Sequence, residues 1–270
     1  MKKFFAALLA MVMTMSLLTA CGGSEEAEAT EATDVVAEEG TSAALADGVL
    51  TVGTNAEFPP FEYVNDAGEP DGFDIALIKA IGEKLGVEVV VENMEFASLI
   101  SSIGSKIDVS IAGMTVTEER KQSVDFSNSY YEAVQYVILP VDSPIATAED
   151  LKNKAIGVQL GTTGDFIASD IEGAVVSQYN KAVDAVNDLI NGRVDCVIVD
   201  KNPALVFEGK FEGQVVAVDG AQFAFEPEQY AIAMPKGDTA LVQQINAALE
   251  EIKADGTFDE LVKTYIEGEE

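Results

Sequence analysis

The sequence predicts an α/β protein whose sheets are largely parallel. Short apolar runs typical of buried strands alternate with segments of helical periodicity, which is the pattern of βαβ units. The chain has 270 residues, enough for two modest lobes with separate cores even without an N-terminal leader. Together these observations indicate an α/β protein, and its length permits two lobes.

The first half of the chain is expected to form one α/β lobe. In order, we expect a strand at 49–53, a helix at 73–85, a strand at 87–91, a helix at 96–104 and a strand at 107–112. Within the first helix, Ile75, Ile78 and Ile81 share one side with Leu85. The segment Asn65-Asp-Ala-Gly-Glu-Pro70 is expected to be a hairpin loop, because its acids lack the spacing of a calcium-binding loop.

A second series of elements begins near Gln135. It comprises strands at 136–139, 155–158, 175–178 and 195–199, helices at 163–169 and 181–190, then a strand at 230–234 and a helix at 239–253. Thr147-Ala-Glu-Asp150 has the pattern of a capping box and predicts a helix start. Asn191-Gly192 supplies the glycine that commonly follows a helix end. The α/β pattern therefore continues through the second half.

The N-terminus, at residues 1–20, has the features of a bacterial lipoprotein signal peptide. A lysine pair precedes an apolar segment at 4–18, and Leu18-Thr-Ala-Cys21 places a cysteine directly after small residues. An ordinary signal peptide and a membrane span are the alternatives. The apolar run is short for a span, which needs about 20 residues, and the cysteine favours lipidation. We expect Cys21 to carry a lipid such as palmitate, which would anchor the protein to the outer face of the cell membrane.

Residues 21–47 are dominated by acidic and small residues. Such a segment cannot bury enough apolar surface to offset the entropy lost on ordering, so we expect a disordered, self-repelling tether. It would space the folded body from the membrane surface.

Composition excludes several classes of function. The formal charge is −31 and no basic stripe is present, so nucleic-acid binding, which depends on Lys and Arg at phosphates, is not expected. The chain has no His, which excludes Ser-His-Asp and Cys-His catalysis and histidine-based zinc sites. Cys196 lies in an apolar run and is expected to be a buried strand residue, not a reactive thiol. We expect no cofactor and no metal.

The stretch Ile111-Ala-Gly-Met-Thr-Val-Thr-Glu-Glu-Arg120 ends an apolar run with hydroxyls, a glycine and one arginine. An arginine held just beyond a buried strand can bind a carboxylate through two parallel hydrogen bonds. The alternative is a surface arginine in a helix-opening turn, because Thr117-Glu-Glu is typical of a helix N-terminus. This stretch alone does not separate the two interpretations.

Five sequence blocks carry a resemblance that runs from Val49 to Ile266. They are Leu50-Thr-Val-Gly-Thr-Asn-Ala-Glu-Phe-Pro-Pro-Phe61 with Gly72-Phe-Asp-Ile75; Gly113-Met-Thr-Val-Thr-Glu-Glu-Arg120 with Val124-Asp-Phe-Ser127; Gly157-Val-Gln-Leu-Gly-Thr-Thr-Gly164; Gly192-Arg-Val-Asp195 with Val199-Asp200; and Lys253-Ala-Asp-Gly-Thr-Phe258. In this order, the blocks resemble the extracellular solute-binding family for polar amino acids, the binding proteins of ABC importers. Each block is weak alone, but the ordered set is specific.

The resemblance implies a two-lobed periplasmic-binding-protein fold of type II, the Venus-flytrap architecture. Lobe 1 would comprise residues 48–134 and 228–270, and lobe 2 residues 135–227, with two interlobe crossings near 132–136 and 223–228. It also implies a monomer that closes on an amino acid and delivers it to an ABC transporter permease.

The resemblance further implies a ligand-binding site formed by Asn55, Phe58, Phe96, Gly113, Thr115, Arg120, Thr163 and Asp200. Arg120 and the amides of Thr115 and Thr163 would bind the ligand's carboxylate. Asp200, the Gly113 carbonyl and the Thr115 hydroxyl would accept from its ammonium. The two phenylalanines would sandwich the side chain, with Asn55 and Glu57 nearby. As alternatives, the phenylalanines are ordinary core residues and Asp200 is only a helix N-cap before Pro203.

Two rival functions stay open. The fold also hosts cyclohexadienyl dehydratases, which resemble these binding proteins, and a dehydratase would need an acid or base such as Glu57. An amino-acid sensor or adhesive lipoprotein could use the same clamp. For the ligand, an amide at Asn55, where many relatives carry an Asp, favours a neutral polar amino acid such as glutamine or cystine over lysine and arginine. Glu57 could compensate for that missing charge or point to solvent.

Overall fold

The strands form two five-stranded sheets connected by a two-stranded ribbon. The computed structural model describes residues 42–267, all of which belong to the unit Glu39–Glu270. In the first sheet the strand order is β5-β1-β6-β15-β7, and β5, β1 and β6 run parallel. Its strands are β1 (Val49–Thr54), β5 (Glu88–Asn93), β6 (Val109–Ser110), β7 (Val124–Phe126) and β15 (Ala233–Pro235).

The second sheet has the strand order β11-β10-β12-β9-β13. Strands β11, β10 and β12 run parallel, whereas β9 is antiparallel to both of its neighbours. Its strands are β9 (Gln135–Pro140), β10 (Ala155–Gln159), β11 (Val175–Tyr179), β12 (Cys196–Asp200) and β13 (Val215–Asp219). All five come from one continuous stretch of chain, whereas the first sheet combines strands that precede and follow it.

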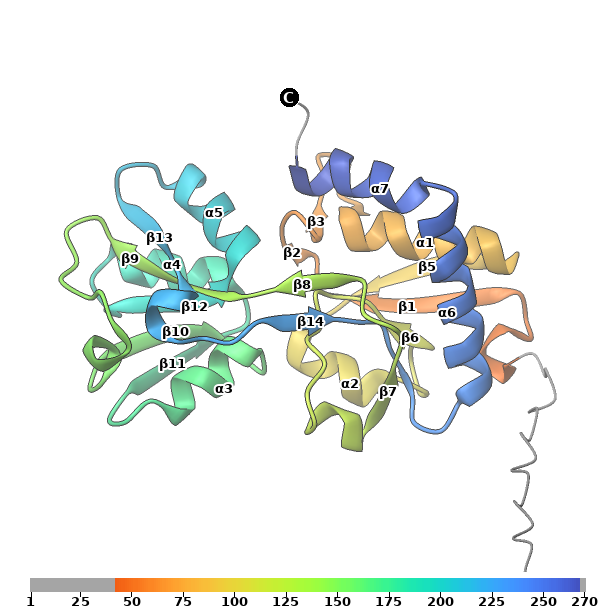
Figure 1. Ribbon diagram of the computed structural model, residues 1–270, viewed down its shortest axis with the longest axis horizontal. Coiled ribbons are helices and arrows are strands. Elements are labelled where there is room, and N and C mark those ends of the chain that lie inside the picture. Colours follow the sequence, from red (N-terminus) through yellow and green to blue (C-terminus); the bar gives the residue numbers. More distant parts are fainter. Residues whose placement is uncertain (1–41, 268–270) are drawn as a thin grey trace, which may run out of the picture. The chain divides into compact units, whose positions relative to one another are not determined.

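Two strands connect the sheets. β8 (Tyr131–Ala133) and β14 (Glu228–Tyr230) pair antiparallel, with Tyr131 opposite Tyr230 and Ala133 opposite Glu228. Figure 1 shows this ribbon running between the two sheets. β8 precedes β9 of the second sheet, and β14 precedes β15 of the first. The two crossings expected from the sequence are therefore confirmed.

The helices lie beside the sheets, as Figure 1 shows. Next to the first sheet are α1 (Phe73–Leu85), α2 (Leu99–Ser102), α6 (Thr239–Ala254) and α7 (Thr257–Leu261), and next to the second are α3 (Thr163–Asp170), α4 (Ala182–Ile190) and α5 (Lys201–Lys210). Short 3-10 turns occur at η1 (Ala43–Leu45), η2 (Phe96–Ser98), η3 (Arg120–Gln122), η4 (Ala148–Leu151) and η5 (Gly220–Phe223), and a π-turn at η6 (Val262–Glu267). No helix within residues 42–267 is long and apolar enough to cross a membrane.

Helix α1 has the bounds that the periodicity predicts. Ile75, Ile78 and Ile81 are buried on the side that faces the core. Gly72 starts the helix with a φ of 123°, and a Cβ there would lie 2.4 Å from the Phe61 carbonyl oxygen, so only glycine fits. This close approach fixes α1 against the segment that precedes it.

Three short strands precede α1. β2 (Glu57–Phe58), β3 (Glu62–Val64) and β4 (Pro70–Asp71) form a small antiparallel sheet. The segment from Asn65 to Pro70 connects β3 to β4, and the Asn65 side chain accepts hydrogen bonds from the amides of Ala67 and Glu69. The predicted hairpin loop is therefore confirmed.

Several predicted elements are shorter than the sequence suggested. The expected helix at 96–104 is reduced to η2 and α2, and the strand at 107–112 to the two residues of β6. The run at 230–234 divides because Tyr230 pairs with Tyr131 in the ribbon, whereas Ala233 pairs with Ser110 and Phe126 in the first sheet. The helix predicted to begin after Thr147 is the 3-10 turn η4, whose Asp150 carboxylate accepts from the Thr147 amide as a capping box requires.

The predicted disordered tether at 21–47 extends too far toward the folded body. Ser42 is buried. Its amide donates to Gln244 within α6, and its hydroxyl donates to Asp238, the residue that caps the start of α6. Leu45 packs into the core beneath. One leucine and one serine make these contacts, which the acidic composition of the segment concealed. The signal peptide at 1–20, Cys21 and the remainder of the tether lie outside the described residues.

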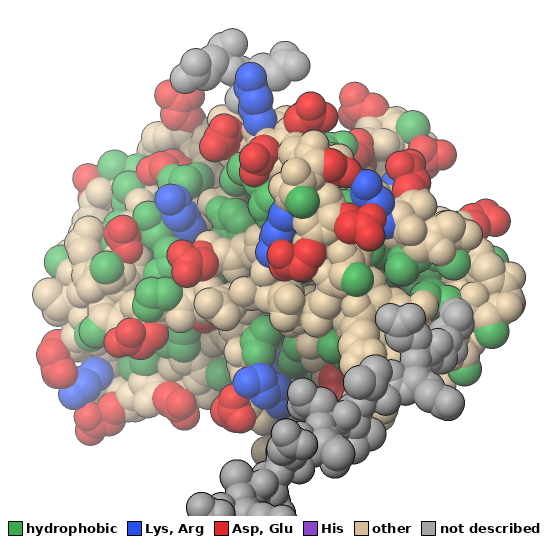
Figure 2. All heavy atoms as spheres, turned by 45° about the vertical axis from the view of Figure 1, so that its right-hand side comes forward, with side chains coloured by type: hydrophobic (Ala, Val, Ile, Leu, Met, Phe, Trp, Pro, Cys, Tyr) green, Lys and Arg blue, Asp and Glu red, His purple; other side chains and the backbone are tan. Residues whose placement is uncertain are grey.

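Most of the large apolar side chains are buried, as expected for an α/β fold. The core contains Leu50, Val52 and Val109 from the first sheet and Val197 from the second. Cys196 is buried in the second sheet, and burial raises the pKa of its thiol to about 12, so it is an inert core residue. Figure 2 shows acidic side chains spread over the face drawn, with few lysines and arginines among them.

Candidate functional site

A pocket lies among loops from both sheets. It is lined by Asn55, Phe58, Phe96, Ala112, Gly113, Thr115, Arg120, Gln159, Thr162, Thr163 and Asp200. Most of these residues lie at or just beyond the carboxyl ends of β1, β6, β10 and β12. Small-molecule sites in α/β proteins form at these strand ends. All eight residues expected from the sequence line the pocket, together with Ala112, Gln159 and Thr162, which were not expected.

Arg120 is buried at the pocket wall, with only 6% of its surface exposed. Its Nη1 donates to the Thr115 carbonyl at 2.6 Å, and its Nη2 donates to the Gly161 carbonyl at 3.0 Å. Phe96 and Phe166 lie within 6 Å of the guanidinium carbon, in cation–π range. Burial lowers the pKa of Arg120, an effect that the negative charges of Glu228 and Asp200 oppose. The alternative of a surface arginine is therefore wrong.

Asp200 ends β12 and is also buried. The Tyr230 hydroxyl donates a hydrogen bond to its Oδ1. Burial, and then repulsion from Glu228, raise the pKa of Asp200 to about 7. Asp200 occupies the N-cap position of α5, but its side chain makes no capping hydrogen bond. The carboxyl group is therefore available to the pocket and is costly to ionise without a positive partner.

Two threonine hydroxyls converge on Glu228, at the start of β14. Thr115 donates to Glu228 Oε2 at 2.6 Å and Thr163 donates at 2.8 Å, and the amide of Gln135 lies at 3.4 Å. A hydroxyl has one proton and two lone pairs, so each threonine is left with acceptor capacity only. The sequence did not single out Glu228 or Gln135; their places at the starts of β14 and β9, beside the crossings, were the only available signal.

Gly113 adopts a backbone conformation that favours glycine, with a φ of 52°. A Cβ at this position would lie 3.0 Å from a ring carbon of Phe58. The Gly113 amide donates to Asp74 Oδ2 at 2.7 Å. Phe58 itself is 7% exposed and packs on Phe61, so it is both a core residue and part of the pocket lining. The two interpretations of Phe58, as a core residue and as part of the site, are therefore compatible.

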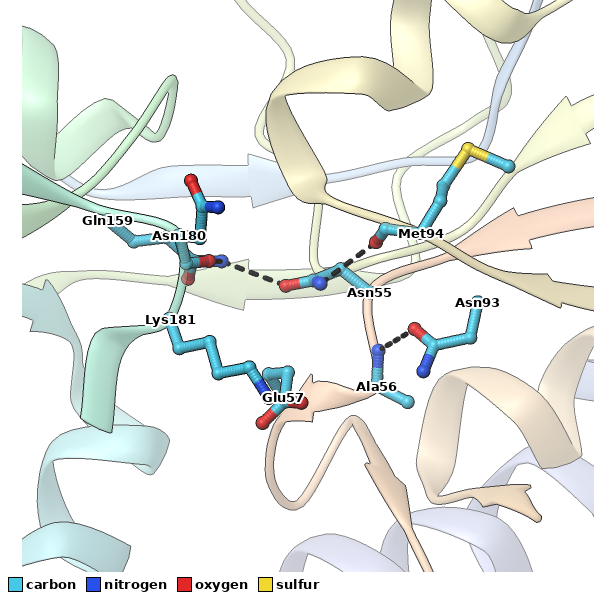
Figure 3. Close-up of polar contacts among 8 residues, drawn as sticks. All are labelled: Asn55, Ala56, Glu57, Asn93, Met94, Gln159, Asn180 and Lys181. Carbon is cyan, nitrogen blue, oxygen red and sulfur yellow. Dashed lines mark hydrogen bonds and ion pairs between the residues drawn. The ribbon is translucent and has the colours of Figure 1, made fainter. Parts of the chain in front are cut away.

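At another wall of the pocket, polar side chains of the two halves meet (Figure 3). Asn55 donates to the Met94 carbonyl at 2.9 Å and accepts from Gln159 at 2.8 Å. Beside them, Glu57 and Lys181 form an ion pair at 2.5 Å. Glu57 therefore points neither into the pocket nor freely to solvent, because Lys181 from the second half engages it.

One enclosed cavity thus presents a guanidinium, a carboxyl group and several hydroxyl and carbonyl acceptors, between two α/β halves joined by two crossing strands. This combination defines a two-lobed binding protein for a small polar solute. The sequence model of the family "Bacterial extracellular solute-binding proteins, family 3" matches residues 50–268, and the chain belongs to this family.

Individual relatives are similar over most of the chain. The arginine-binding extracellular protein ArtP of Bacillus subtilis is 34% identical, with all of both chains covered. The ABC transporter glutamine-binding protein GlnH of the same organism is 32% identical, with 98% of each chain covered. An ancestral arginine-binding protein is 42% identical, with 81% of this chain and 98% of that chain covered; its structures bound to arginine and to glutamine superpose with TM-scores of 0.77 and 0.74. The type II periplasmic-binding-protein fold is therefore confirmed.

Proposed function

We propose that this protein binds an α-amino acid between its two lobes and delivers it to the permease of an ABC importer. The observation that carries the proposal is the presence of Arg120 and Asp200, buried and of opposite charge, on the walls of one small cavity. A zwitterion supplies the complementary charge to each of them. Membership of the solute-binding family supports the transport role.

The carboxylate of the ligand would lie at Arg120. Two of the five N–H groups of a guanidinium are used by the Thr115 and Gly161 carbonyls, so others remain for the ligand. Thr163 is the first residue of α3, and helix N-termini present unpaired amides that favour anions. Arg120 and these amides would therefore hold the carboxylate together.

The ammonium of the ligand would lie at Asp200, with the Gly113 carbonyl and the Thr115 hydroxyl as further acceptors. Thr115 is suited to this role because its proton is committed to Glu228. An ammonium beside Asp200 would offset the cost of burying that carboxylate. Binding would therefore stabilise the ionised form of Asp200.

The side chain of the ligand would contact Phe58, Phe96 and Asn55, together with Gln159. Asn55 and Gln159 carry amides, and the nearest acid, Glu57, is neutralised by Lys181. This chemistry supports a neutral polar ligand such as glutamine or cystine over lysine and arginine. Relatives named for arginine and for glutamine are 34% and 32% identical to this chain, and the ancestral arginine-binding protein, at 42%, has structures bound to arginine and to glutamine, so similarity does not decide the ligand class.

Closure of the lobes would report occupancy to the permease. In the closed form, Arg120 and Asp200 are shielded from water, which is unfavourable unless the ligand pairs with both charges. A ligand therefore shifts the population toward the closed form, which the permease can distinguish from the open form.

The N-terminal proposals complete this picture. We propose a signal peptide at 1–20, a lipid on Cys21 and an acidic tether from 21 to about 41, which would hold a monomer on the outer face of the membrane. The lobes would comprise 48–134 with 228–270, and 135–227. The extracellular location of the family supports this arrangement. The relatives above are named as binding proteins, and Glu57, the acid expected for a dehydratase, lies outside the pocket lining and pairs with Lys181, which favours the binding function.

A thermal-shift screen of the twenty amino acids tests the binding function. A ligand at a hundredfold excess over its dissociation constant stabilises the folded protein by about 2.7 kcal/mol, which raises the melting temperature by a few degrees. We expect such a shift for glutamine or cystine, and its loss in Arg120→Ala. Absence of a shift with every amino acid would contradict the proposed ligand class.

A further inference from the structure

Two carboxyl groups lie buried behind the pocket wall, outside the lining described above. Glu62 belongs to β3 and Asp74 to the first turn of α1, and neither has any exposed surface. Neither carboxyl takes part in an ion pair within residues 42–267. A buried carboxylate is normally paired with a positive charge, so this arrangement requires an explanation.

The two carboxyl groups differ in the donors they receive. Asp74 Oδ2 accepts from the Gly113 amide at 2.7 Å and from the Tyr130 hydroxyl at 2.8 Å. Asp74 Oδ1 and both oxygens of Glu62 have no donor among the described groups. If one of the two carboxyl groups is protonated, its O–H can donate a hydrogen bond to the other and so connect the pair.

The surroundings offer no other compensation. Phe61, Phe73 and Tyr230 pack around Tyr130 and one another, which makes the region apolar. The charged or titratable groups that act on the pair are Tyr130 and Asp200, and Asp200 adds further negative charge. Two adjacent carboxylates in such a place cannot both ionise at moderate cost, so they titrate as a pair.

The donors decide which carboxyl holds the proton. Asp74 is stabilised as a carboxylate by two hydrogen bonds, whereas Glu62 receives none. Burial and the neighbouring Asp74 raise the pKa of Glu62 well above its usual value, and burial raises that of Asp74 to about 6. The difference in donors therefore assigns the proton at neutral pH to Glu62, whose O–H can donate to Asp74.

We propose that Glu62 and Asp74 share one proton. Protonated Glu62 keeps Asp74 in place, and Asp74 acts as a positioning residue: it fixes the backbone of Gly113, whose carbonyl accepts from the ligand's ammonium. This inference rests on the proposed function. Gly113 lines the pocket in a conformation with a φ of 52°. The hydrogen bond from its backbone amide to Asp74 holds this residue on the side away from the pocket. A charge-assisted hydrogen bond is shorter and stronger than a neutral one, which suits it to hold that conformation.

The shared proton is tested by infrared spectroscopy of the ligand-free protein at neutral pH, with Asp200→Asn introduced into every protein compared, the wild type included, because Asp200, whose pKa is about 7, would otherwise add an acid band of its own. We expect the band of a protonated carboxylic acid in the wild type and its loss in Glu62→Gln, whose side-chain amide still donates to Asp74. Glu69→Gln, which changes an exposed acid of the neighbouring hairpin loop, is the matched control and should keep the band. A wild-type spectrum without the band, or a band that survives Glu62→Gln, overturns the shared proton.

The positioning role is tested by the NMR resonance of the Gly113 amide proton. A bond to a carboxylate moves this resonance downfield. We expect Glu62→Gln to keep the shift, and Asp74→Asn, which replaces the charged acceptor by a neutral one, to reduce it. An unchanged resonance in folded Asp74→Asn overturns the positioning role, and this measurement requires no ligand.

Titration with L-glutamine and with L-arginine connects the pair to binding. We expect Asp74→Asn to weaken the tighter of the two ligands by about tenfold, and Glu62→Gln to weaken it by less than about threefold. Equal losses in both variants, or wild-type affinity in Asp74→Asn, overturn the link to the ammonium site. If the wild type binds no amino acid, the proposed function fails, whereas the infrared and NMR results still decide the pair.

Discussion

Arg120 donates to two carbonyl oxygens from different halves of the chain, that of Thr115 at 2.6 Å and that of Gly161 at 3.0 Å. The same guanidinium is expected to hold the ligand's carboxylate. The proposed ligand recognition and the contact between the two halves would therefore depend on the same side chain. A buried charge that loses its partner is strongly destabilising, so this residue ties closure to the presence of an anion.

Replacing Arg120 by alanine should abolish this connection. Removing one partner of a buried charge pair typically costs about 2–5 kcal/mol, so affinity for the amino acid should fall by roughly 30- to 4,000-fold. Isothermal titration calorimetry measures the loss. Arg193→Ala is the matched control, because Arg193 is largely exposed and pairs only with Asp188 at the surface. Unchanged affinity in Arg120→Ala would exclude the carboxylate clamp.

The pKa of Asp200, raised to about 7, predicts a pH dependence of binding. The ligand's ammonium needs the carboxylate form, so affinity should fall as pH is lowered from about 8 to 5, and binding near neutral pH should release protons. Asp200→Asn should bind at least about tenfold more weakly and should lose most of this pH dependence. Titrations in buffers of different ionisation enthalpy measure the released protons. A pH-independent affinity in the wild type contradicts the assignment.

Asp200 also predicts how the stability of the ligand-free protein changes with pH. Its folded pKa lies above the unfolded value, so the native state binds more protons between about pH 4 and 7. The stability from this group is therefore present below about pH 4 and is lost as pH rises through about 7. Asp200→Asn should show a smaller loss in urea melts, whereas Asp74, whose pKa is about 6, continues to contribute in both proteins.

The ion pair between Glu57 and Lys181 joins the two halves, so it should stabilise only the closed state of the lobes. Both side chains are partly exposed, and such pairs contribute roughly 0–1 kcal/mol, so Lys181→Met should weaken ligand binding by less than about fivefold. Because the pair joins the two halves, the loss should occur mainly in the dissociation rate and should diminish in high salt. Lys84→Met, which removes the comparable pair with Asp255 within the first lobe, is the control. Equal effects of both variants would contradict a role in closure.

The anchor is tested by Cys21→Ser. If Cys21 is acylated, this variant should be released from membranes or retain its signal peptide, as seen by membrane fractionation and mass spectrometry. Ligand binding should be unchanged, because the expected tether separates the anchor from the pocket. Acylation that persists in the variant would refute the assignment.

The sequence predicts well the parts of this protein whose pattern is local. Helix α1 has the expected bounds because its apolar spacing, its starting glycine and its final glycine agree. Arg120 was singled out because it follows an apolar strand-like run, whereas the expected binding roles of Arg120 and Asp200 came from the resemblance to the solute-binding family. The short β6 was overestimated because apolar residues that leave the sheet to line the pocket, such as Ala112, have the same composition as strand residues.

Residues whose roles depend on distant pairing were missed. Glu228 meets the hydroxyls of Thr115 and Thr163 only because the two crossing strands place it beneath the pocket. Glu62 lies in a short strand and Asp74 in the first turn of a helix, two places where an acid is normally exposed. Local sequence contains no signal for such contacts, because they arise when separate elements pack together.

The proposed ligand preference follows from the amides at the side-chain wall of the pocket. Asn55 bonds to the Met94 carbonyl and to Gln159, so no free acid faces a distal cation there. We expect glutamine or cystine to bind more tightly than arginine or lysine. Asn55→Asp should reverse this order, because it introduces a negative charge in a partly desolvated cleft, and arginine affinity should rise about tenfold or more.

Calorimetric titration of wild type and Asn55→Asp with glutamine, cystine, arginine and lysine measures the preference. Asn93→Asp is a suitable control, because Asn93 lies next to the site but outside the pocket lining, where its side chain accepts from the Ala56 amide. This control should leave the order of affinities unchanged. A wild-type affinity for arginine or lysine tenfold better than for any neutral ligand would show that the amide wall does not set selectivity, since Asn55 and Gln159 would then tolerate a cation without a counter-charge. Glu57 would become the residue to test next, because a long cationic side chain could displace Lys181 from it.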